Sequence, residues 1–550
     1  MNNLLTSALL LLALLLPATA TAYDFEVDSI YYNKIDTTVI VTFGDKNIWN
    51  DNDNYSGEVT IPSTVTYNDT TYEVISIGDL AFSHCAGLTK VSIPNTVTTI
   101  GEEAFLDCNG LMSITIPNSI TTIGQAAFAG CTGLTSVTIP ASVTSIGDFA
   151  FGDCGGLTTL SVNSGNKKYD SRNSCNAIIE TATNKLIVGC QNSVLTDTIT
   201  AIGERAFYYC TGLTSANIPD SVTSIGKAAF FGCSGLKSVT IGCSVKSIGS
   251  IAFGDCGSLT DITVASENES YDSRDNCNAI IETATNSLIV GGQNTIIPNT
   301  VDTICDAAFY CNGLTSISIP SPVRHIGKSA FEGCSSLTSV NISNSVKHIG
   351  KSAFLDCYSL KDVSIPNSIK TISTKLFAGC ISLENVIIPS SVKVIGNDAF
   401  AGCSSLTSVT IPSSVDTISS YAFAYCNRLK DVYSHIPNLS KVESENSIFT
   451  VWSEDGHYDY TGRTLHVPQG TKATYQADEN WYPYFGQIVD DLIRDTVPGD
   501  VNGDGSVNIA DINAVIDMIL RGIYDSDGDV NSDDAVNITD INVLINLILS

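Results

Sequence analysis

The chain has 550 residues, 43% of them hydrophobic and 15% charged, so it is long enough to bury a large core. Asp and Glu outnumber Lys and Arg by 57 to 27, which gives a net charge of −30. A surface of this charge argues against nucleic acid and anionic membranes as general partners.

Residues 1–22 have the pattern of a signal peptide. Leu4 to Leu16 is an apolar run too short to cross a bilayer, and Ala20, Thr21 and Ala22 form a small-residue cleavage pattern before Tyr23. The run has no preceding Lys or Arg, so an uncleaved anchor is the alternative. We expect a secreted or cell-surface-associated protein with no membrane span after cleavage.

One sequence unit is repeated through the middle of the chain. In the copy from Leu134 to Cys154, Val137 and Ile139 alternate as in a strand, and Val143 and Ile146 mark a second short extended piece. Thirteen phenylalanines mark the copies, mostly 23 residues apart: Phe82, Phe105, Phe128, Phe151, Phe207, Phe230, Phe253, Phe309, Phe331, Phe354, Phe377, Phe400 and Phe423. This period predicts a solenoid in which stacked coils bury one another.

The motif L-x-x-V-x-I-P-x-S-V-x-x-I-G-x-x-A-F-x-x-C resembles the BspA-like class of bacterial leucine-rich repeats over residues 76–432. The resemblance implies a mainly β leucine-rich-repeat solenoid of about thirteen coils. Longer units near 163–200 and 265–300 share the string Cys-Asn-Ala-Ile-Ile-Glu-Thr-Ala-Thr-Asn, which predicts a protruding β-hairpin in each. We expect β-rich caps at 23–75 and 433–493, with Trp49, Trp452 and Trp481 as cap residues.

Thirteen of the eighteen cysteines are assigned to one position of the repeat, beside the phenylalanine, and we call them the cysteine ladder. They are Cys85, Cys108, Cys131, Cys154, Cys210, Cys233, Cys256, Cys311, Cys334, Cys357, Cys380, Cys403 and Cys426. A position fixed by repeat register next to a core aromatic predicts small buried free thiols. Disulfides between neighbouring coils are the alternative, because an exported protein favours them.

The main strands should also present a hydroxyl ladder to solvent. Its members are Ser92, Thr115, Thr138, Ser161, Asn217, Thr240, Thr263, Ser318, Asn341, Ser364, Ile387, Thr410 and Tyr433. Small hydroxylated side chains suit strands without naming a ligand, so a plain surface is expected and partner binding stays open. His325 and His348 lie one period apart, which predicts a solvated pair. With no H-E-x-x-H, G-x-S-x-G or paired-carboxylate pattern, we predict no enzyme.

The last fifty-two residues contain two acidic loops with the ligand spacing of a calcium site. Positions 1, 3, 5, 7, 9 and 12 are Asp500, Asn502, Asp504, the Ser506 carbonyl, Asn508 and Asp511, and then Asp529, Asn531, Asp533, the Ala535 carbonyl, Asn537 and Asp540. This spacing predicts two Ca²⁺ sites. Asp534 stands where the first loop has Gly505, so we expect the second site to be weaker.

Each loop runs into an apolar stripe at helical spacing, and the two stripes predict helices packed face to face. The stripes are Ile512, Val515, Ile516, Ile519 and Leu520, and Ile541, Leu544, Ile545, Ile548 and Leu549. Residues 499–550 resemble a type I dockerin, joined by a linker at 494–498. The resemblance implies a small all-α calcium-binding domain with a cohesin-type partner, contacted by Ile509, Ala510, Ile538 and Thr539.

The expected function is an exported, non-catalytic interaction protein attached through its tail to a cohesin-type receptor or scaffold. The alternative is a surface adhesin that binds host or substrate macromolecules through the solenoid.

Overall fold

The structure is a computed structural model. It describes residues 23–44, 55–439, 443–444, 447–451, 460, 462–492, 499, 501, 507–522, 528–531 and 535–549. The predicted signal peptide, the linker, Trp49 and Trp452 lie outside these residues. The chain divides into two compact units, Met1–Asp272 and Ser273–Ser550, which are described separately.

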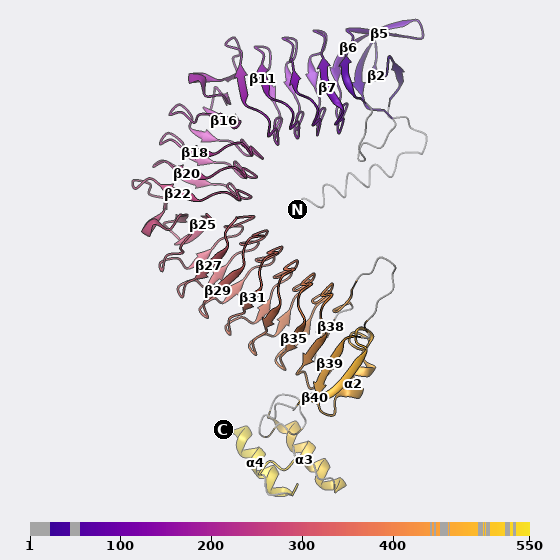
Figure 1. Cartoon of the computed structure of the whole chain (residues 1–550), viewed down its shortest axis with the longest axis vertical. Helices are drawn as coiled ribbons and strands as arrows, with labels where there is room; N and C mark the ends of the chain where they lie inside the picture. Colours follow the sequence, from indigo (N-terminus) through magenta and orange to yellow (C-terminus); the bar gives the residue numbers. More distant parts are fainter. Residues whose placement is uncertain are drawn as a thin grey trace. The chain divides into compact units, whose positions relative to one another are not determined.

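Each solenoid coil contains one longer and one shorter strand, and equivalent strands of successive coils pair in parallel (Figure 1). In β11 (Ser136–Ile139), Val137 and Ile139 are buried, whereas Ser136 and Thr138 are exposed. Val137 lies opposite Leu160 of the next coil, 23 residues later. The predicted alternation is therefore confirmed, and the repeat length equals one coil.

In unit 1, the N-terminal cap is followed by longer and shorter strands. The cap comprises β1 (Phe25–Val27), β2 (Ile30–Ile35), β3 (Thr38–Thr42), β4 (Gly57–Thr60), β5 (Thr64–Tyr67) and β6 (Thr70–Ile77). The longer strands are β7 (Leu88–Ser92), β11, β13 (Thr159–Val162), β18 (Ser215–Asn217), β20 (Ser238–Ile241) and β22 (Asp261–Val264), and β9 (Ser113–Ile114) takes the same place in its coil although it has only two residues. The shorter strands are β8 (Thr99–Ile100), β10 (Thr122–Ile123), β12 (Ser145–Ile146), β17 (Ala201–Ile202), β19 (Ser224–Ile225), β21 (Ser247–Ile248) and β23 (Tyr271–Asp272).

Unit 2 repeats this alternation. Its longer strands are β27 (Ser316–Ile319), β29 (Ser339–Ile342), β31 (Asp362–Ser364), β33 (Asn385–Ile387), β35 (Ser408–Ile411) and β37 (Asp431–Ser434). Its shorter strands are β26 (Thr303–Ile304), β28 (His325–Ile326), β30 (His348–Ile349), β32 (Thr371–Ile372), β34 (Val394–Ile395), β36 (Thr417–Ile418) and β38 (Glu443–Ser444). The C-terminal cap contains β39 (Thr464–Pro468), α2 (Lys472–Ala477), η4 (Tyr482–Tyr484) and β40 (Gln487–Leu492), and the tail contains α3 (Ile509–Arg521) and α4 (Ile538–Leu549).

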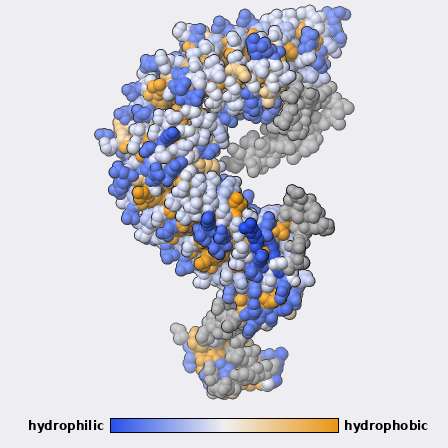
Figure 2. All heavy atoms as spheres, in the orientation of Figure 1, coloured by the Kyte–Doolittle hydropathy of each residue, from blue (hydrophilic) through white to orange (hydrophobic). Residues whose placement is uncertain are grey.

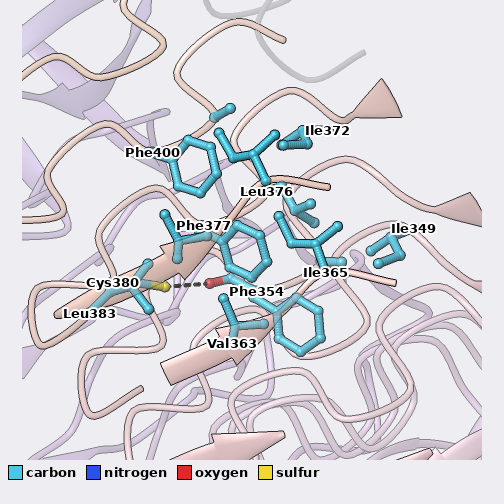
Figure 3. Close-up of a cluster of buried hydrophobic side chains, with 14 of the residues drawn as sticks. Ile349, Phe354, Val363, Ile365, Ile372, Leu376, Phe377, Cys380, Leu383 and Phe400 are labelled. Carbon is cyan, nitrogen blue, oxygen red and sulfur yellow. Dashed lines mark hydrogen bonds between the residues drawn. The ribbon is translucent and has the colours of Figure 1, made fainter. Parts of the chain in front are cut away.

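The repeat phenylalanines stack as parallel rings in three runs, Phe82 to Phe151, Phe207 to Phe253 and Phe309 to Phe423, called here together the phenylalanine stack. Phe354 lies 5.1 Å from Phe331, measured between ring centroids. It lies 5.6 Å from Phe377 on its other side (Figure 3). In unit 1, Tyr55 packs on the first ring, Phe82, at 4.5 Å. In unit 2, Phe449 continues the stack beyond the repeats and contacts Trp481, which is fully buried, as expected of a cap residue.

The cysteine ladder lies beside this stack, and ten of its members bond their coil to the one before it. Sγ of Cys380 donates to the carbonyl oxygen of Phe354 at 3.2 Å (Figure 3). The same bond is made by Cys108, Cys131, Cys154, Cys233, Cys256, Cys334, Cys357, Cys403 and Cys426. All eighteen cysteines are free thiols. The ladder therefore supplies hydrogen bonds as well as apolar volume.

One assignment to the ladder is wrong. Cys311 follows Phe309 by two residues instead of three, because this coil is one residue shorter, and it is only partly buried. Asn312 occupies the ladder position: its Nδ2 donates to the Gly291 carbonyl at 3.1 Å and its Oδ1 accepts from the Leu314 amide at 3.0 Å. An amide donor thus replaces the thiol at this coil.

Thiol labelling should separate the cysteines by burial. Burial raises the pKa of Cys154 and Cys426 to about 12, and it is the thiolate that attacks an alkylating reagent, so these thiols should react slowly. At pH 8 the native protein should react only at the partly buried Cys243, Cys305 and Cys311, and the other fifteen should react after denaturation without reductant. Mass spectrometry of alkylated peptides checks this, and ladder peptides that stay unlabelled in denaturant would indicate disulfides.

The two longer units do not protrude as predicted, because their hairpins are built into the sheet. In unit 1, β14 (Tyr169–Asp170), β15 (Ile178–Glu180) and β16 (Lys185–Val188) pair in that order, and β16 then pairs in parallel with β17 of the next coil. In unit 2, β24 (Ala279–Glu282) and β25 (Ser287–Gly291) likewise lead into β26. The solenoid has about 17 turns, whereas thirteen were expected from the number of repeat phenylalanines. The strands of the two longer units add turns that contain no repeat phenylalanine, which helps to explain the difference.

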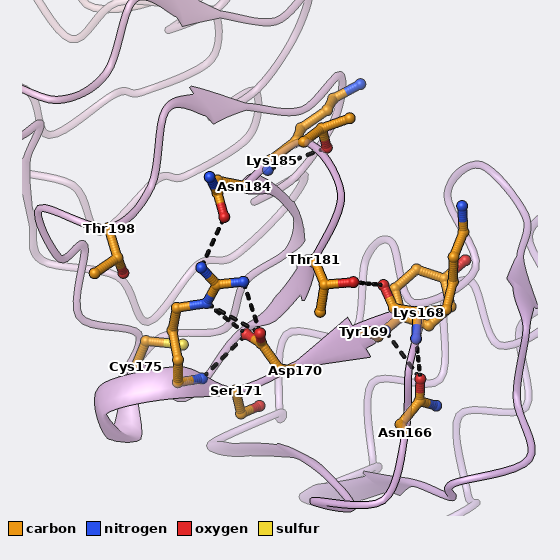
Figure 4. A network of polar contacts seen from close by, with 12 residues as sticks. Asn166, Lys168, Tyr169, Asp170, Ser171, Cys175, Thr181, Asn184, Lys185 and Thr198 are labelled. Carbon is orange, nitrogen blue, oxygen red and sulfur yellow. Dashed lines mark hydrogen bonds and ion pairs between the residues drawn. The ribbon is translucent and has the colours of Figure 1, made fainter.

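Polar side chains bond to one another within the first longer unit (Figure 4), and two of them also anchor it to the coil before it. Nδ2 of Asn166 donates to the carbonyls of Pro140 and Val143 at 2.8 and 2.9 Å, and its Oδ1 accepts from the amide of Tyr169. The Tyr169 hydroxyl accepts from the amide of Ile146 at 3.1 Å. The 3-10 turns η1 (Arg172–Ser174) and η2 (Arg274–Asn276) follow β14 and β23, respectively.

Candidate functional site

The tail helix α3 begins at one of the predicted calcium loops. Its N-cap is Asn508, whose Oδ1 accepts from the Ala510 amide at 2.9 Å, while Oδ2 of Asp511 accepts from the Asn508 amide at 2.7 Å. Asp511 is fully buried. Gly522 ends the helix in the left-handed conformation, at φ 63°, where glycine is favoured. The side chains at loop positions 9 and 12 are thus held together at the start of α3.

Helix α4 repeats this arrangement 29 residues later. Oδ1 of Asn537 accepts from the Thr539 amide at 2.8 Å, and Oδ2 of the fully buried Asp540 accepts from the Asn537 amide at 2.8 Å. Oδ1 of Asp540 also accepts from the Asn531 amide at 3.1 Å. The second loop therefore folds back so that positions 3, 9 and 12 meet.

The chemistry of these groups suits a hard cation. Asp529, at position 1 of the second loop, is buried together with Asp540. The single basic residue of the tail, Arg521, pairs with Asp517 at 2.9 Å on the exposed side of α3. Buried carboxylates need compensating charge, and clustered carboxylate and carbonyl oxygens are the ligands that Ca²⁺ prefers.

The described residues contain seven of the twelve predicted ligands: Asn508, Asp511, Asp529, Asn531, Ala535, Asn537 and Asp540. Asp500, Asn502, Asp504, Ser506 and Asp533 lie outside them, as do Gly505 and Asp534.

The two helices pack less completely than their apolar stripes predict. Val515 and Leu544 are fully buried and form a small core with Val501. The helix ends instead expose apolar side chains in matching pairs: Ile509 and Ile538 are 71% and 70% exposed, and Leu520 and Leu549 are both 79% exposed. Ile516 and Ile545 occupy equivalent positions in the two helices, as do Ile519 and Ile548, and all four are 37–39% exposed. The expected face-to-face packing is therefore confirmed for the centre of the stripes, where Ile512 and Ile541 pack against this core, and the exposed members leave a repeated apolar surface.

Four members of the hydroxyl ladder bond to one another. Thr138 and Ser161 lie 2.9 Å apart, and Thr263 donates to Thr240 at 3.2 Å, in each case between adjacent coils. These bonds agree with the plain surface expected from the sequence.

The C-terminal end of the ladder differs from the rest. Tyr433 stacks on His466 with ring centroids 4.4 Å apart. Nδ1 of His466 lies 2.9 Å from Asp491, and Nε2 lies 3.6 Å from Asp431. Sequence reasoning missed His466 because it lies outside the repeats, although the pattern Thr464-Leu465-His466-Val467 has the alternation of a further strand.

His325 and His348 stack with ring centroids 4.8 Å apart. Across the part of the chain that the structure describes, no three His, Cys, Asp or Glu side chains gather as a metal site would require.

The repeats and the tail each match a known protein family. The family described as BspA type leucine-rich repeat region matches residues 62–177, 177–287 and 348–450. The family described as dockerin type I domain, whose members bind calcium, matches residues 498–549. None of the curated proteins matches the chain.

Similar solved structures are bacterial leucine-rich repeat proteins. A leucine-rich cell surface protein from Faecalibacterium prausnitzii is 29% identical, over 78% of this chain and 96% of that one, with a TM-score of 0.43. A leucine-rich repeat protein from Bacteroides ovatus is 27% identical, over 85% of this chain and 100% of that one, with a TM-score of 0.37.

Proposed function

Because the chain belongs to the BspA-type leucine-rich repeat family and ends in a type I dockerin domain, we propose that it is an exported interaction protein held on a cohesin-type receptor or scaffold. Leucine-rich repeat and dockerin domains of these families are typical of extracellular bacterial proteins, and neither family indicates a catalytic domain. Export would use residues 1–22. In the described part of the chain, no helix is both long and apolar enough for a membrane span.

The repeated apolar surface of α3 and α4 carries this proposal. A tail of fifty-two residues exposes four matching pairs of apolar side chains, which is the composition expected of a protein-binding surface. Ile509 and Ile538 are the most exposed members at the helix starts, beside Ala510 and Thr539, where the partner contacts are expected.

Calcium would position this surface. Asp500, Asn502, Asp504, the Ser506 carbonyl, Asn508 and Asp511 would hold one ion, and Asp529, Asn531, Asp533, the Ala535 carbonyl, Asn537 and Asp540 the other. The ion supplies positive charge to buried carboxylates that also cap α3 and α4, so binding would stabilise both helix starts. Asp534 motivates the expectation that the second site is weaker.

A surface adhesin remains the second candidate function. The solenoid presents a long exposed face, and its C-terminal end carries the stacked Tyr433 and His466, a polar aromatic site of the kind that binds extracellular macromolecules. Matrix binding that persists after deletion of residues 499–550 would favour this function.

Capture of a cohesin-type module by the full chain tests the proposal. The wild-type chain should be captured in Ca²⁺ and released by EDTA. Replacing both Ile509 and Ile538 by Asp should weaken capture by about 100-fold or more, since buried interface anchors typically contribute at least 2 kcal/mol each. Met112→Asp, at an exposed apolar residue of the solenoid, is the matched control. Unchanged capture by the double variant would contradict the proposed surface.

A further inference from the structure

Four cationic side chains occupy the same position in four successive coils of unit 2. Arg324, Lys347, Lys370 and Lys393 each stand directly before a short strand, β28, β30, β32 and β34 respectively, and all four are exposed. The Lys347 amide donates to the Arg324 carbonyl, and the Lys393 amide to the Lys370 carbonyl, both at 2.8 Å. We call this set the basic column.

The spacing of the column follows from the rings beside it. His325 and His348, next to the first two cations, stack with centroids 4.8 Å apart. The core phenylalanines of the same coils are separated by 5.1, 5.6 and 5.5 Å. The backbone positions of the column therefore repeat about every 5 Å, the spacing of stacked strands, with one cationic side chain at each.

The column is basic, although the protein as a whole is acidic. Residues 323–393 contain eight Lys and Arg but four Asp and Glu, in a chain where acidic residues outnumber basic ones 57 to 27. On the face shown in Figure 2, strongly hydrophilic residues gather over the coils labelled β31 to β35 in Figure 1.

The column also has defined ends. The same coil position is Asp302 before it and Asp416 after it, and Asp416 pairs with Lys393 at 3.6 Å. Within the described residues, Arg324, Lys347 and Lys370 form no ion pair.

The fold does not require cations at this position. In unit 1 the equivalent residues are Thr98, Thr121, Thr144, Thr200, Thr223 and Lys246. Like charges on adjacent coils repel one another, so the run of Arg324, Lys347 and Lys370 is unfavourable until an anion neutralises it.

The neighbours of the column indicate the kind of anion. On one side lie Pro322, Ser345, Ser368 and Ser391, and on the other lie His325, His348, Thr371 and Val394. Six of these eight neighbours are polar, and Pro322 and Val394 are only partly exposed, so the column lacks the large exposed apolar residues that anchor a folded protein partner. The stacked imidazoles cover each other's faces, so they form a poor platform for nucleobases.

We propose that the basic column binds an acidic polysaccharide, a linear sugar polymer with regularly spaced carboxylates or sulfates. Its acid groups would pair with the four cations, and its hydroxyls would hydrogen-bond to the flanking serine, threonine and histidine side chains. This site is separate from the calcium-dependent tail and does not depend on it.

Binding of polygalacturonate to the full chain in EDTA tests the site, because calcium then neither bridges polymers nor loads the tail. The wild-type chain should bind, more weakly as salt rises, as expected where cations displace counter-ions from a polyanion. Lys347→Glu with Lys370→Glu should weaken binding by about tenfold or more, and the milder Lys347→Gln with Lys370→Gln should act in the same direction.

Lys237→Glu with Lys246→Glu is the matched control, since both lysines are exposed on unit 1 and the charge change is equal. Its affinity should stay within about twofold of wild type, after allowance for the long-range effect of net charge. Dextran should not bind. An equal loss of polygalacturonate affinity in the control and column variants would contradict binding at the basic column. Tighter binding of oligo(dT) or poly-L-glutamate than of polygalacturonate would overturn the assigned ligand class. Failure of cohesin capture would leave this result unaffected.

Discussion

Truncating one ring of the phenylalanine stack should lower the free energy of unfolding by about 3–5 kcal/mol in the Phe354→Ala variant. Phe354 is fully buried between Phe331 and Phe377, so its loss removes two ring contacts and leaves a cavity in the middle of the coils. Chemical denaturation of the full chain measures the loss, and hydrogen exchange should locate it in the neighbouring coils, because each coil contacts only its neighbours.

The matched control lies in the same coil. Tyr358 is 45% exposed, so Tyr358→Ala removes an aromatic ring with little loss of packing and should change stability by less than about 1 kcal/mol. Equal destabilisation by the two variants would mean that the stack does not carry the stability assigned to it.

Removing the charge at position 12 of both loops should abolish calcium-dependent capture. Asp511→Asn and Asp540→Asn keep the size of the side chain and an oxygen that can accept the cap hydrogen bond, but they remove a buried carboxylate from each site. Each substitution should lower the calcium affinity of its own site by about 100-fold or more. Even substitution of a residue that only hydrogen-bonds to a metal ligand typically lowers metal affinity by about 10- to 100-fold. Calorimetric calcium titration of the full chain measures this.

Single variants should lose less capture than the double variant. The exposed apolar pairs of α3 and α4 match in position and exposure, so either helix start offers a similar surface. Asp517→Asn is the control, since Asp517 pairs with Arg521 on the exposed side of α3. A single variant as defective as the double would show that the two surfaces are not interchangeable.

Repeat register explains why much of the solenoid could be predicted from the sequence. A fixed period places the residues equivalent to Phe354 and Cys357 at the same depth in the 23-residue coils, so one copy is enough to assign their core. The thiol-to-carbonyl bonds needed coordinates, because sequence spacing does not show which backbone oxygen a side chain reaches. Asn312 was predictable in principle, since counting three residues from Phe309 identifies it.

The expectations that the structure corrects concern which segments pack or pair with one another, and not which helices and strands form. Strand patterns identified β15 and β16, but they do not reveal which sheet edge a hairpin joins, so its entry into the solenoid was missed. Apolar spacing similarly identified α3 and α4 without showing that Leu520 and Leu549 face solvent. His466 was missed because it follows an off-period segment and meets Tyr433 only through strand pairing.

Surface plasmon resonance against an immobilised cohesin-type module tests the central claim most directly, using the full chain and a chain ending at residue 498. The full chain should bind in Ca²⁺ and not in EDTA, and the shortened chain should bind in neither condition while keeping the circular dichroism of the solenoid. Equal binding by the two chains, or binding that survives EDTA, would contradict attachment through the calcium-dependent tail.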